Sequence, residues 1–403
     1  MIVNNTRKKS GKMKILSMVL AMVLLLQTAI VVSAEERFPV NEPESSRKSH
    51  ILIESSTGAV LSESNADKRT APASLTKIML LLIIAEEVNA KRLSLTDDVT
   101  VSANILGKSG AVIWLEPSET MRVCDMVKAV VIASANDAAA ALAEHIAGSE
   151  SEFVKLMNQK AYVLGMRDTN FVNATGYDHP QHYTTARDVA VMSRALMRAE
   201  NYSLFSEFML TRLCSVRTGT ERETQLLNTN KLITRYDGIE GIKAGATVHA
   251  GYCLSASATK NNMRLIGVVM GFDDEDERVQ AAETLLDYGF DNYELYSDFA
   301  AELAPFKDIT VRKGMEHKLK VARQNNNAAI VIPKGRVGDI KYDIYLPEHV
   351  TAPIAQNQPV GTITAKLGGK VVHESYITAT TSVYELTFLR VFTALAKNFF
   401  AVG

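Results

Sequence analysis

The sequence predicts an α+β protein: a main domain of mixed helices and strands, a small all-β domain, and a C-terminal amphipathic helix. Up to about residue 297, some segments have apolar residues at helical spacing, and others alternate or run apolar. From about residue 305, short alternating segments are separated by turn residues, and the final segment has apolar residues three or four apart. We therefore expect domains at residues 47–297 and 305–380 and a helix at 381–403.

The first 34 residues have the layout of a secretory signal peptide. Before Glu35 the chain carries five positive charges and no acid, and an apolar run from Ile15 to Val32 precedes Ser33 and Ala34. Small residues favour cleavage after Ala34, although the run is long enough that an uncleaved anchor stays open as an alternative. We expect residues 35–46 to form a polar linker and the mature protein to lie outside the cytoplasm.

Composition argues against a nucleic-acid partner and against a disulfide scaffold. The formal net charge is −1, so loss of the five N-terminal cations leaves 369 residues with a net charge of −6. Three cysteines are too few for a disulfide framework in an exported chain. We expect Cys253, in an apolar strand-like run, to be a buried thiol. One disulfide between Cys124 and Cys214 stays open.

The main domain is expected to begin with a β-hairpin and to end with two paired strands and a helix. The strands are expected at His50–Glu54 and Ala59–Ser62, then at Gly251–Ala258 and Met263–Met270, which an Asn-Asn turn joins. Helices are expected, in chain order, at Ile78–Ile84, Met121–Ile132, Ala138–Ala147 with Asn136 or Asp137 as its cap, Phe153–Leu164, Thr184–Arg198 with a threonine cap, and Glu277–Tyr288. Residues 93–117 have no clear pattern.

The second domain is expected to be a small β-sandwich. Its predicted strands are Asp308–Arg312, Ala328–Ile332, Ile340–Tyr345, Val360–Ala365 and Lys370–Tyr376, with turns such as Pro333-Lys334-Gly335 between them.

The terminal helix at 381–403 has an apolar stripe that includes Leu389 and Phe392, but internal charges argue against a membrane span. It either docks on the protein or, as we prefer, lies in the outer face of the cytoplasmic membrane.

One helix start brings a hydroxyl and an amine together. Pro72 suits the first turn of a helix, and Ser74 and Lys77 then share one face, one turn apart. A serine attacks a carbonyl only when a base takes its proton, and a lysine held neutral can do so. The pattern Ser-x-x-Lys also occurs at Ser45 and Ser257, but only the copy at Ser74 opens a helix. Alone, it would more often be a helix-start serine with a surface lysine.

Two further segments supply what acyl transfer by serine requires. Ser134-Ala135-Asn136 lies in a tight turn between two predicted helices and offers a second hydroxyl and an amide. A rival copy, Ser102-Ala103-Asn104, lacks that setting. Lys243-Ala244-Gly245 precedes a strand and offers a cation followed by glycine, which lets a substrate backbone approach closely.

These three motifs, in this order and at this spacing, resemble those of penicillin-binding proteins and serine β-lactamases. The neighbouring residues look more like the low-molecular-mass D-alanyl-D-alanine carboxypeptidases, as do the second domain and the terminal helix. The similar stretches are Ala73 to Met79, Ser134 to Ala138, Thr184 to Asp188, Ala250 to Leu254 and Ile332 to Gly335. The resemblance implies a β-lactamase/transpeptidase-like domain: an antiparallel sheet flanked by helices, with the Ser74 helix buried between the sheet and a helical subdomain.

The resemblance also implies an activity and its participants. The enzyme would remove the terminal D-alanine from peptidoglycan stem peptides ending in D-Ala-D-Ala, and β-lactams would acylate it. Ser74 would be the acylated nucleophile, Lys77 its base, and Ser134 the relay that passes a proton to the departing D-alanine.

Five residues would bind substrate, again by resemblance: Asn136, Lys243, Gly245, Ala246 and Thr247. Asn136 would hold the peptide backbone, and Lys243 would attract the terminal carboxylate. The backbone N–H groups of Ser74 and Ala246 would form the oxyanion hole, and Thr247 would add a hydroxyl near the carboxylate.

One position departs from the family pattern. Ala244 stands where the family usually has threonine or serine, whose hydroxyl is expected to bind the substrate carboxylate. A lost hydrogen bond to a charged group costs about 1.5 to 3 kcal/mol, so weaker or altered activity is one expectation unless Thr247 compensates. Two alternatives stay open: a β-lactamase or esterase of the same fold, and a non-catalytic relative that binds wall peptides.

Other conspicuous residues have ordinary interpretations. His179 and His182 lie in a loop without a third clustered ligand, so neither a metal nor another cofactor is expected. His249 could line the cleft or lie on the surface. The lone Trp114, beside apolar neighbours, is expected in the core.

Overall fold

The computed structural model describes residues 48–297, 305–324 and 329–393. The predicted signal peptide at 1–34, the linker at 35–46 and the last ten residues of the predicted terminal helix therefore lie outside the described residues.

A five-stranded antiparallel sheet forms the centre of the main domain, with the strand order β2-β1-β9-β8-β7. Its strands are β1 (Ser49–Glu54), β2 (Val60–Ser64), β7 (Ile239–Thr247), β8 (Gly251–Lys260) and β9 (Met263–Phe272). The predicted hairpin and the predicted pair of strands are confirmed. Strand β7, which carries the lysine-glycine motif, is an edge strand of this sheet.

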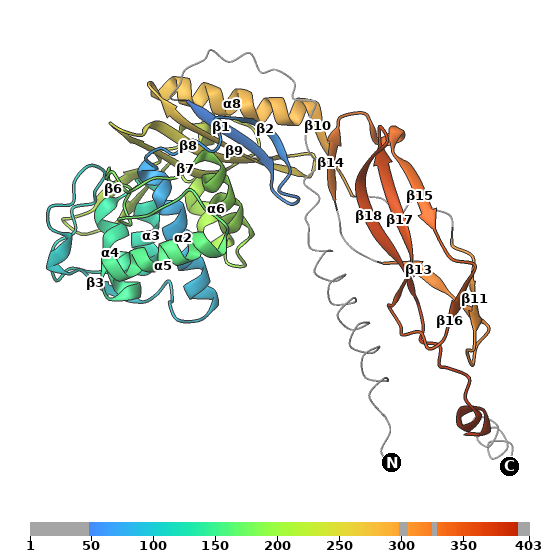
Figure 1. Ribbon diagram of the computed structural model, residues 1–403. Helices are drawn as coiled ribbons and strands as arrows, with labels where there is room; N and C mark the ends of the chain where they lie inside the picture. Colours follow the sequence, from blue (N-terminus) through green and yellow to red (C-terminus); the bar gives the residue numbers. More distant parts are fainter. Residues whose placement is uncertain (1–47, 298–304, 325–328, 394–403) are drawn as a thin grey trace, which may run out of the picture. The chain divides into compact units, whose positions relative to one another are not determined.

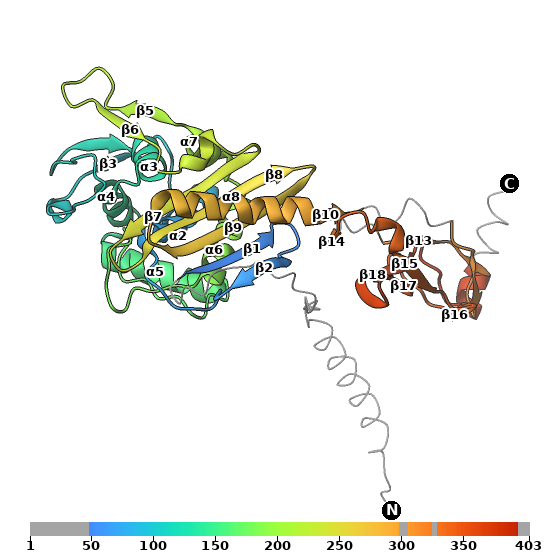
Figure 2. The ribbon, with the colours of Figure 1, turned by 90° about the horizontal axis from the view of Figure 1, so that it is seen from above.

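Helices cover the two faces of the sheet (Figures 1 and 2). Helix α8 (Glu275–Asn292) packs on one face, where Leu285 and Leu286 join a core with residues of β8 and β9. Helices α2 (Thr76–Asn89) and α6 (Ala186–Arg198) pack on the other face, against a second and larger core. These helices confirm the predicted α+β class.

A helical subdomain lies beyond α2. It contains the helices α3 (Val123–Ile132), α4 (Asn136–Ala147), α5 (Glu150–Val163) and α7 (Ser203–Leu210). It also contains two antiparallel strand pairs: β3 (Asp98–Thr100) pairs with β4 (Thr120–Arg122), and β5 (Leu213–Val216) pairs with β6 (Thr224–Leu227). Short 3₁₀ turns occur at η1 (Ala73–Leu75), η2 (Ala103–Ile105) and η3 (Lys231–Thr234). Helix α2 is buried continuously from Thr76 to Ala85, as expected for a helix covered on all sides.

Two cap predictions had different outcomes. Thr185 caps α6 by accepting a hydrogen bond from the N–H of Asp188, as predicted. The prediction that Asn136 or Asp137 caps α4 is wrong, because the N-cap is Ala135 and no side chain caps the helix. Asn136 instead bonds to Lys77 and to the backbone oxygen of Ser109, and Asp137 accepts from the N–H groups of Ile113 and Leu115.

The second domain consists of strands, as predicted. One sheet has the order β12-β11-β16, another the order β13-β18-β17-β15, and β10 pairs with β14. The strands are β10 (Tyr293–Tyr296), β11 (Ile309–Arg312), β12 (Lys318–Leu319), β13 (Val321–Arg323), β14 (Ile330–Pro333), β15 (Lys341–Tyr345), β16 (His349–Thr351), β17 (Pro359–Leu367) and β18 (Lys370–Ala379), with the turn η4 (Val337–Asp339). One hydrophobic core joins Ile309 and Leu319 of the first sheet to Ala379 of the second.

The described end of the chain is helical from residue 388 to 393. Phe388, Leu389 and Phe392 are 86%, 70% and 60% exposed, so these apolar side chains are not docked on the protein. Among the described helices, none has the length and apolar character needed to cross a lipid bilayer.

Candidate active site

Ser74 and Lys77 lie together at the start of α2. Pro72 is the N-cap of the turn η1, which holds Ser74 and runs directly into α2. One helical turn later, Nζ of Lys77 lies 3.0 Å from Oγ of Ser74. The spacing along the helix therefore produces the contact between hydroxyl and amine.

Lys77 has three oxygen neighbours, and their chemistry determines from which of them a neutral amine can accept a hydrogen bond. Its Nζ lies 2.7 Å from Oδ1 of Asn136 and 2.6 Å from the backbone oxygen of Thr175, besides Oγ of Ser74. An ammonium can donate to all three, whereas a neutral amine has only two protons and one lone pair. Because the Ser74 hydroxyl is the one neighbour that can donate, a neutral Lys77 accepts its proton.

Burial favours that neutral form. Lys77 is 0% exposed, and desolvation together with the nearby positive charge of Lys243 holds its pKa well below the usual value for lysine. The carboxylate of Asp137 acts in the opposite direction. Deep burial beside a second cation therefore favours the neutral amine, the form that can act as a base.

The second motif lies in the turn between α3 and α4. Ser134 has a positive φ of 60°, which a non-glycine residue rarely adopts, and its Oγ is buried without a hydrogen-bond partner among the described residues. Nδ2 of Asn136 donates to the backbone oxygen of Ser109, so the other amide atom, Oδ1, faces Lys77. The side-chain amide of Asn136 therefore connects the second motif to Lys77 of the first by a hydrogen bond.

The third motif passes directly against the nucleophile. A Cβ atom added to Gly245 would lie 2.7 Å from the backbone nitrogen of Ser74, so β7 can approach this closely only with glycine there. Ala246 is the next residue of the strand and is exposed. The peptide N–H groups of Ser74 and Ala246 therefore belong to adjoining segments of one site.

Lys243 is a second buried amine. It is 1% exposed, and its Nζ donates to the backbone oxygen of Ala244 at 3.2 Å. Burial, helped by the positive charge of Arg278, lowers its pKa to about 7. Arg278, buried in the first turns of α8, was not identified from the sequence, because its segment looked like a solvated acidic turn.

Two further side chains of β7, those of Ala244 and Thr247, have defined surroundings in the protein. Ala244 is 3% exposed and packs with the apolar residues between the sheet and α8. The hydroxyl of Thr247 donates to Oδ1 of Asp178 at 2.6 Å and accepts from the N–H of Ala250. Oδ2 of Asp178 lies 3.0 Å from Nδ1 of His249. The Thr247 hydroxyl therefore already has two partners within the protein.

The loop from 173 to 178 belongs to the site and was missed. Thr175 supplies a carbonyl to Lys77, and a Cβ atom at Gly176 would lie 2.0 Å from the backbone oxygen of Ala73. The sequence showed only a polar stretch rich in turn residues. The glycine in that stretch was a weak signal of close packing.

Asp137 holds another segment against the site. Its carboxylate accepts from the N–H groups of Ile113, Leu115 and Ala138 and is 2% exposed. The rival motif at Ser102 is engaged elsewhere, since its hydroxyl donates to Glu144 at 2.5 Å. The structure therefore brings together Ser74, Lys77, Ser134 and Asn136 with Lys243 and Gly245, and leaves Ser102 outside.

His182 is a buried positioning residue. Its Nδ1 accepts from the N–H of Val172, which leaves the proton on Nε2, 2.9 Å from Oγ1 of Thr76. Burial lowers the pKa of His182 to about 4, so the ring is neutral. It therefore supports the first residue of α2, next to Lys77. Within the described residues, no cluster of three metal-ligating side chains includes it.

This burial predicts an acid sensitivity. Below about pH 6.5 the unfolded chain binds a proton at this histidine before the folded chain does, so stability falls from there toward pH 4, by about 3 kcal/mol in total. We expect His182→Gln to lose less stability than the wild type between pH 7 and pH 4.5, measured by urea unfolding. The exposed His145 gives the control His145→Gln, whose loss should equal that of the wild type. Equal losses in all three proteins would contradict the role of His182.

Comparison with known proteins gives matches over nearly the whole described chain. Residues 36–274 match the family described as D-alanyl-D-alanine carboxypeptidase. Residues 293–385 match the family described as penicillin-binding protein 5, C-terminal domain.

Individual proteins agree with these matches. D-alanyl-D-alanine carboxypeptidase DacF of Bacillus subtilis (strain 168) is 38% identical over 85% of this chain and 87% of its own length. D-alanyl-D-alanine carboxypeptidase DacC of Escherichia coli (strain K12) is 35% identical over 83% of this chain and 84% of its own length. The crystal structure of penicillin binding protein 5 from Haemophilus influenzae is similar with a TM-score of 0.74 and 30% identity, covering 86% of this chain and all of that one.

Proposed function

Because this chain belongs to the family of D-alanyl-D-alanine carboxypeptidases, penicillin-binding serine hydrolases of the cell wall, we propose that it works through an acyl-enzyme on Ser74. The substrate is a peptidoglycan stem peptide ending in D-Ala-D-Ala. The observation that carries this proposal is the buried amine of Lys77, 3.0 Å from Oγ of Ser74. Resemblance to the family supplies the substrate class.

In the first half of the reaction, Oγ of Ser74 attacks the carbonyl carbon of the penultimate D-alanine. Lys77 takes the hydroxyl proton, a role that its lowered pKa supports because burial favours the neutral amine. The N–H groups of Ser74 and Ala246 bind the oxyanion, a role that the close approach of Gly245 to Ser74 supports.

Collapse of the tetrahedral intermediate breaks the peptide bond, and the leaving amine takes the proton that Lys77 had removed from Ser74. Ser134 relays this proton, because its buried hydroxyl lacks another partner among the described residues. Lys243 attracts the terminal carboxylate, and the second proton of Nδ2 of Asn136 is available to the peptide backbone. Water then attacks the ester on Ser74, with Lys77 again as base, and frees the shortened peptide.

The test is to measure D-alanine release from a stem pentapeptide together with the mass of the intact protein after benzylpenicillin. We expect D-alanine release and a stable penicilloyl adduct. Rapid hydrolysis of penicillin without an adduct would favour a β-lactamase of the same fold instead. No release and no adduct would favour a non-catalytic relative.

A catalytically weakened enzyme is the second candidate, and the bonds of Thr247 support it. Compensation for the missing hydroxyl at Ala244 would require Thr247 to leave Asp178, to which it donates at 2.6 Å. If the hydroxyl matters, Ala244→Thr should release D-alanine faster than the wild type. No gain would count against the carboxylate argument, and the burial of Ala244 offers a reason for that outcome.

Lys243 predicts the alkaline side of the pH profile. Its pKa of about 7 means that the free enzyme loses this positive charge above neutral pH, so attraction of the substrate carboxylate weakens. We expect kcat/KM for a pentapeptide to fall as the pH rises from 7 to 9. Lys243→Arg keeps its charge throughout this range, so the fall should disappear in that variant. An identical fall in both proteins would exclude Lys243 as its source.

We propose further that the protein is exported and associates with the outer face of the cytoplasmic membrane. The cationic and apolar N-terminal segment supports export. The exposed Phe388, Leu389 and Phe392 support binding in the membrane interface. Flotation of the mature protein with lipid vesicles, compared with a chain ending at Thr381, tests this; equal flotation would exclude the helix as the anchor.

A further inference from the structure

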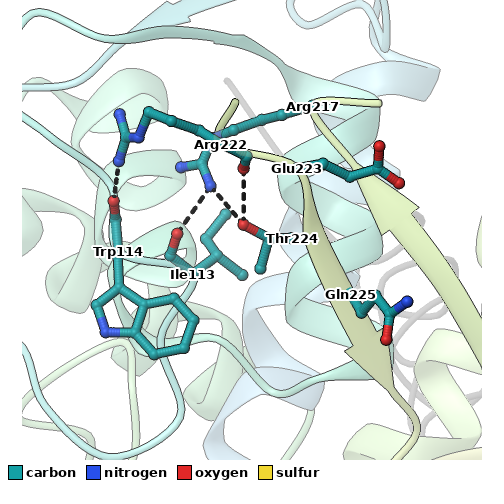
Figure 3. A pocket seen from close by; sticks show the side chains of 7 residues that line it. All are labelled: Ile113, Trp114, Arg217, Arg222, Glu223, Thr224 and Gln225. Carbon is teal, nitrogen blue, oxygen red and sulfur yellow. Dashed lines mark hydrogen bonds between the residues drawn. The ribbon is translucent and has the colours of Figure 1, made fainter. Parts of the chain in front are cut away.

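A pocket lies beside the hairpin β5–β6, and none of the residues proposed for catalysis lines it. This hairpin pocket has a volume of about 350 Å³. Figure 3 shows Trp114 on one side of it, Gln225 on another, and the side chains of Arg217 and Arg222 between them. The size suits one small ring of a ligand.

Trp114 presents an aromatic ring to this pocket. The prediction that it lies in the core is wrong, because its side chain is 69% exposed. Its backbone has a positive φ of 53°. The N–H groups of its neighbours Ile113 and Leu115 donate to the carboxylate of Asp137. The buried neighbours and the unusual backbone together turn the indole outward. An exposed aromatic face held in this way is suited to stacking against the C–H face of a ring.

Arg217 supplies an unused donor. Its side chain is 8% exposed; Nε donates to Glu119, and Nη1 donates to the carbonyl of Ile113 and to Thr224. Among the described residues, none accepts from Nη2, which is buried in the lining of the pocket. A buried guanidinium nitrogen without an acceptor favours a ligand that brings a carbonyl or hydroxyl oxygen.

The charges favour an uncharged ligand over an acid. Arg217 and Arg222 are paired with Glu119, and Arg222 also with Glu116 at 3.1 Å, so the two cations are balanced by two carboxylates. Glu223 adds one more negative charge to the lining. The negative charge of Glu223 would repel a free carboxylate. A neutral ring that carries both hydrogen-bond donors and acceptors could bond to the polar groups of the lining.

The pocket also lies within reach of the proposed reaction. The backbone oxygen of Ala111 accepts from the N–H of Asn136 at 2.6 Å, and Trp114 follows three residues later, a span of at most about 10 Å. In a stem pentapeptide, four residues separate the bond cut at Ser74 from the amino sugar that carries the peptide. Both spans are of the same order.

We propose that the hairpin pocket is a glycan subsite that binds an N-acetylated amino sugar of the strand carrying the stem peptide. The sugar ring stacks on Trp114, its acetamido carbonyl accepts from Nη2 of Arg217, and its hydroxyls bond to Gln225 and Glu223. This inference deepens the proposed function and rests on it for the identity of the sugar.

Trp114 is the single tryptophan of the chain, so it reports on its own pocket. We expect tri-N-acetylchitotriose to change the tryptophan emission of the mature protein saturably, and cellotriose, which lacks acetamido groups, to change it much less. Gln225→Ala should weaken the binding about fivefold to tenfold. Tyr162→Ala, at an 86% exposed ring outside the pocket, should bind like the wild type.

Three results would overturn the proposal: no response to the acetylated sugar, an equal response to cellotriose, or saturation by N-acetyl-D-glutamate instead. Emission does not depend on turnover. If the protein binds the sugar but penicillin does not acylate it, the glycan subsite stands and the proposed reaction is excluded. If penicillin acylates the protein but the sugar does not bind, the proposed reaction stands and the glycan subsite is excluded.

A kinetic comparison tests the link to the substrate. Trp114→Ala removes the ring but keeps the backbone oxygen to which Nη2 of Arg222 donates. We expect it to raise KM for a disaccharide pentapeptide about fivefold to tenfold and to leave KM for the free pentapeptide and the rate of penicillin labelling unchanged. Equal effects on both peptides would indicate a structural role for Trp114 and overturn the subsite.

Discussion

Ser74→Ala is expected to abolish penicillin labelling and to lower D-alanine release by about 10⁴-fold or more. The physical reason is that no other described hydroxyl contacts the buried amine of Lys77, so no second nucleophile can use the same base. The measurements are the intact mass after benzylpenicillin and the initial rate of D-alanine release from a pentapeptide.

The matched control for this variant is Ser102→Ala. Ser102 belongs to the rival motif, and its hydroxyl donates to Glu144 rather than to an amine. We expect this control to label and turn over like the wild type. A Ser74→Ala protein that still forms the adduct, or a Ser102→Ala protein that does not, would exclude Ser74 as the acylated residue.

Lys77→Met is expected to lower kcat by about 10²- to 10⁴-fold, the usual contribution of a general base. Methionine has a similar length and suits a 0% exposed position, but it cannot accept the proton of Ser74. Lys77→Arg should be impaired at every pH up to 10, because its guanidinium stays charged. The decisive measurement is single-turnover acylation by penicillin, which isolates the step that needs the base.

Lys155→Met is the control for removal of a lysine, since that side chain is 71% exposed on α5. It should acylate at the wild-type rate. Circular dichroism of Lys77→Met separates loss of the base from loss of the fold, because Asn136 and Thr175 lose a donor in that variant. Normal acylation by a folded Lys77→Met protein would mean that another group takes the proton.

Local periodicity explains why the first contact could be predicted. Ser74 and Lys77 are three residues apart in one helical segment, and helix geometry alone brings such residues together. The strands β8 and β9 were predictable for a similar reason, because alternation and an Asn-Asn turn are local features. Resemblance of the three ordered motifs then added the family and the substrate class.

Longer-range features were predicted less well. Trp114 has apolar neighbours and was expected in the core, but Asp137 holds the backbone on either side and leaves the indole exposed. The expectation that Thr247 adds a hydroxyl near the substrate carboxylate stays a prediction, and nothing in the sequence indicated that Asp178, far away along the chain, accepts that hydroxyl. Neither partner could be read from the residues next to Trp114 or Thr247.

The sequence by itself determined the chemical groups and their order: a hydroxyl and an amine one helical turn apart, a second serine with its amide, and a lysine followed by glycine. Only the tertiary structure decided that the surroundings of Lys77 favour its neutral form. Its neutral form depends on complete burial, on the charge of Lys243, and on oxygen atoms of Asn136 and Thr175 that lie 59 and 98 positions away. The loss of solvent around an amine depends on every helix, strand and loop that packs against it, whereas spacing along the sequence reveals only its neighbours within one helix.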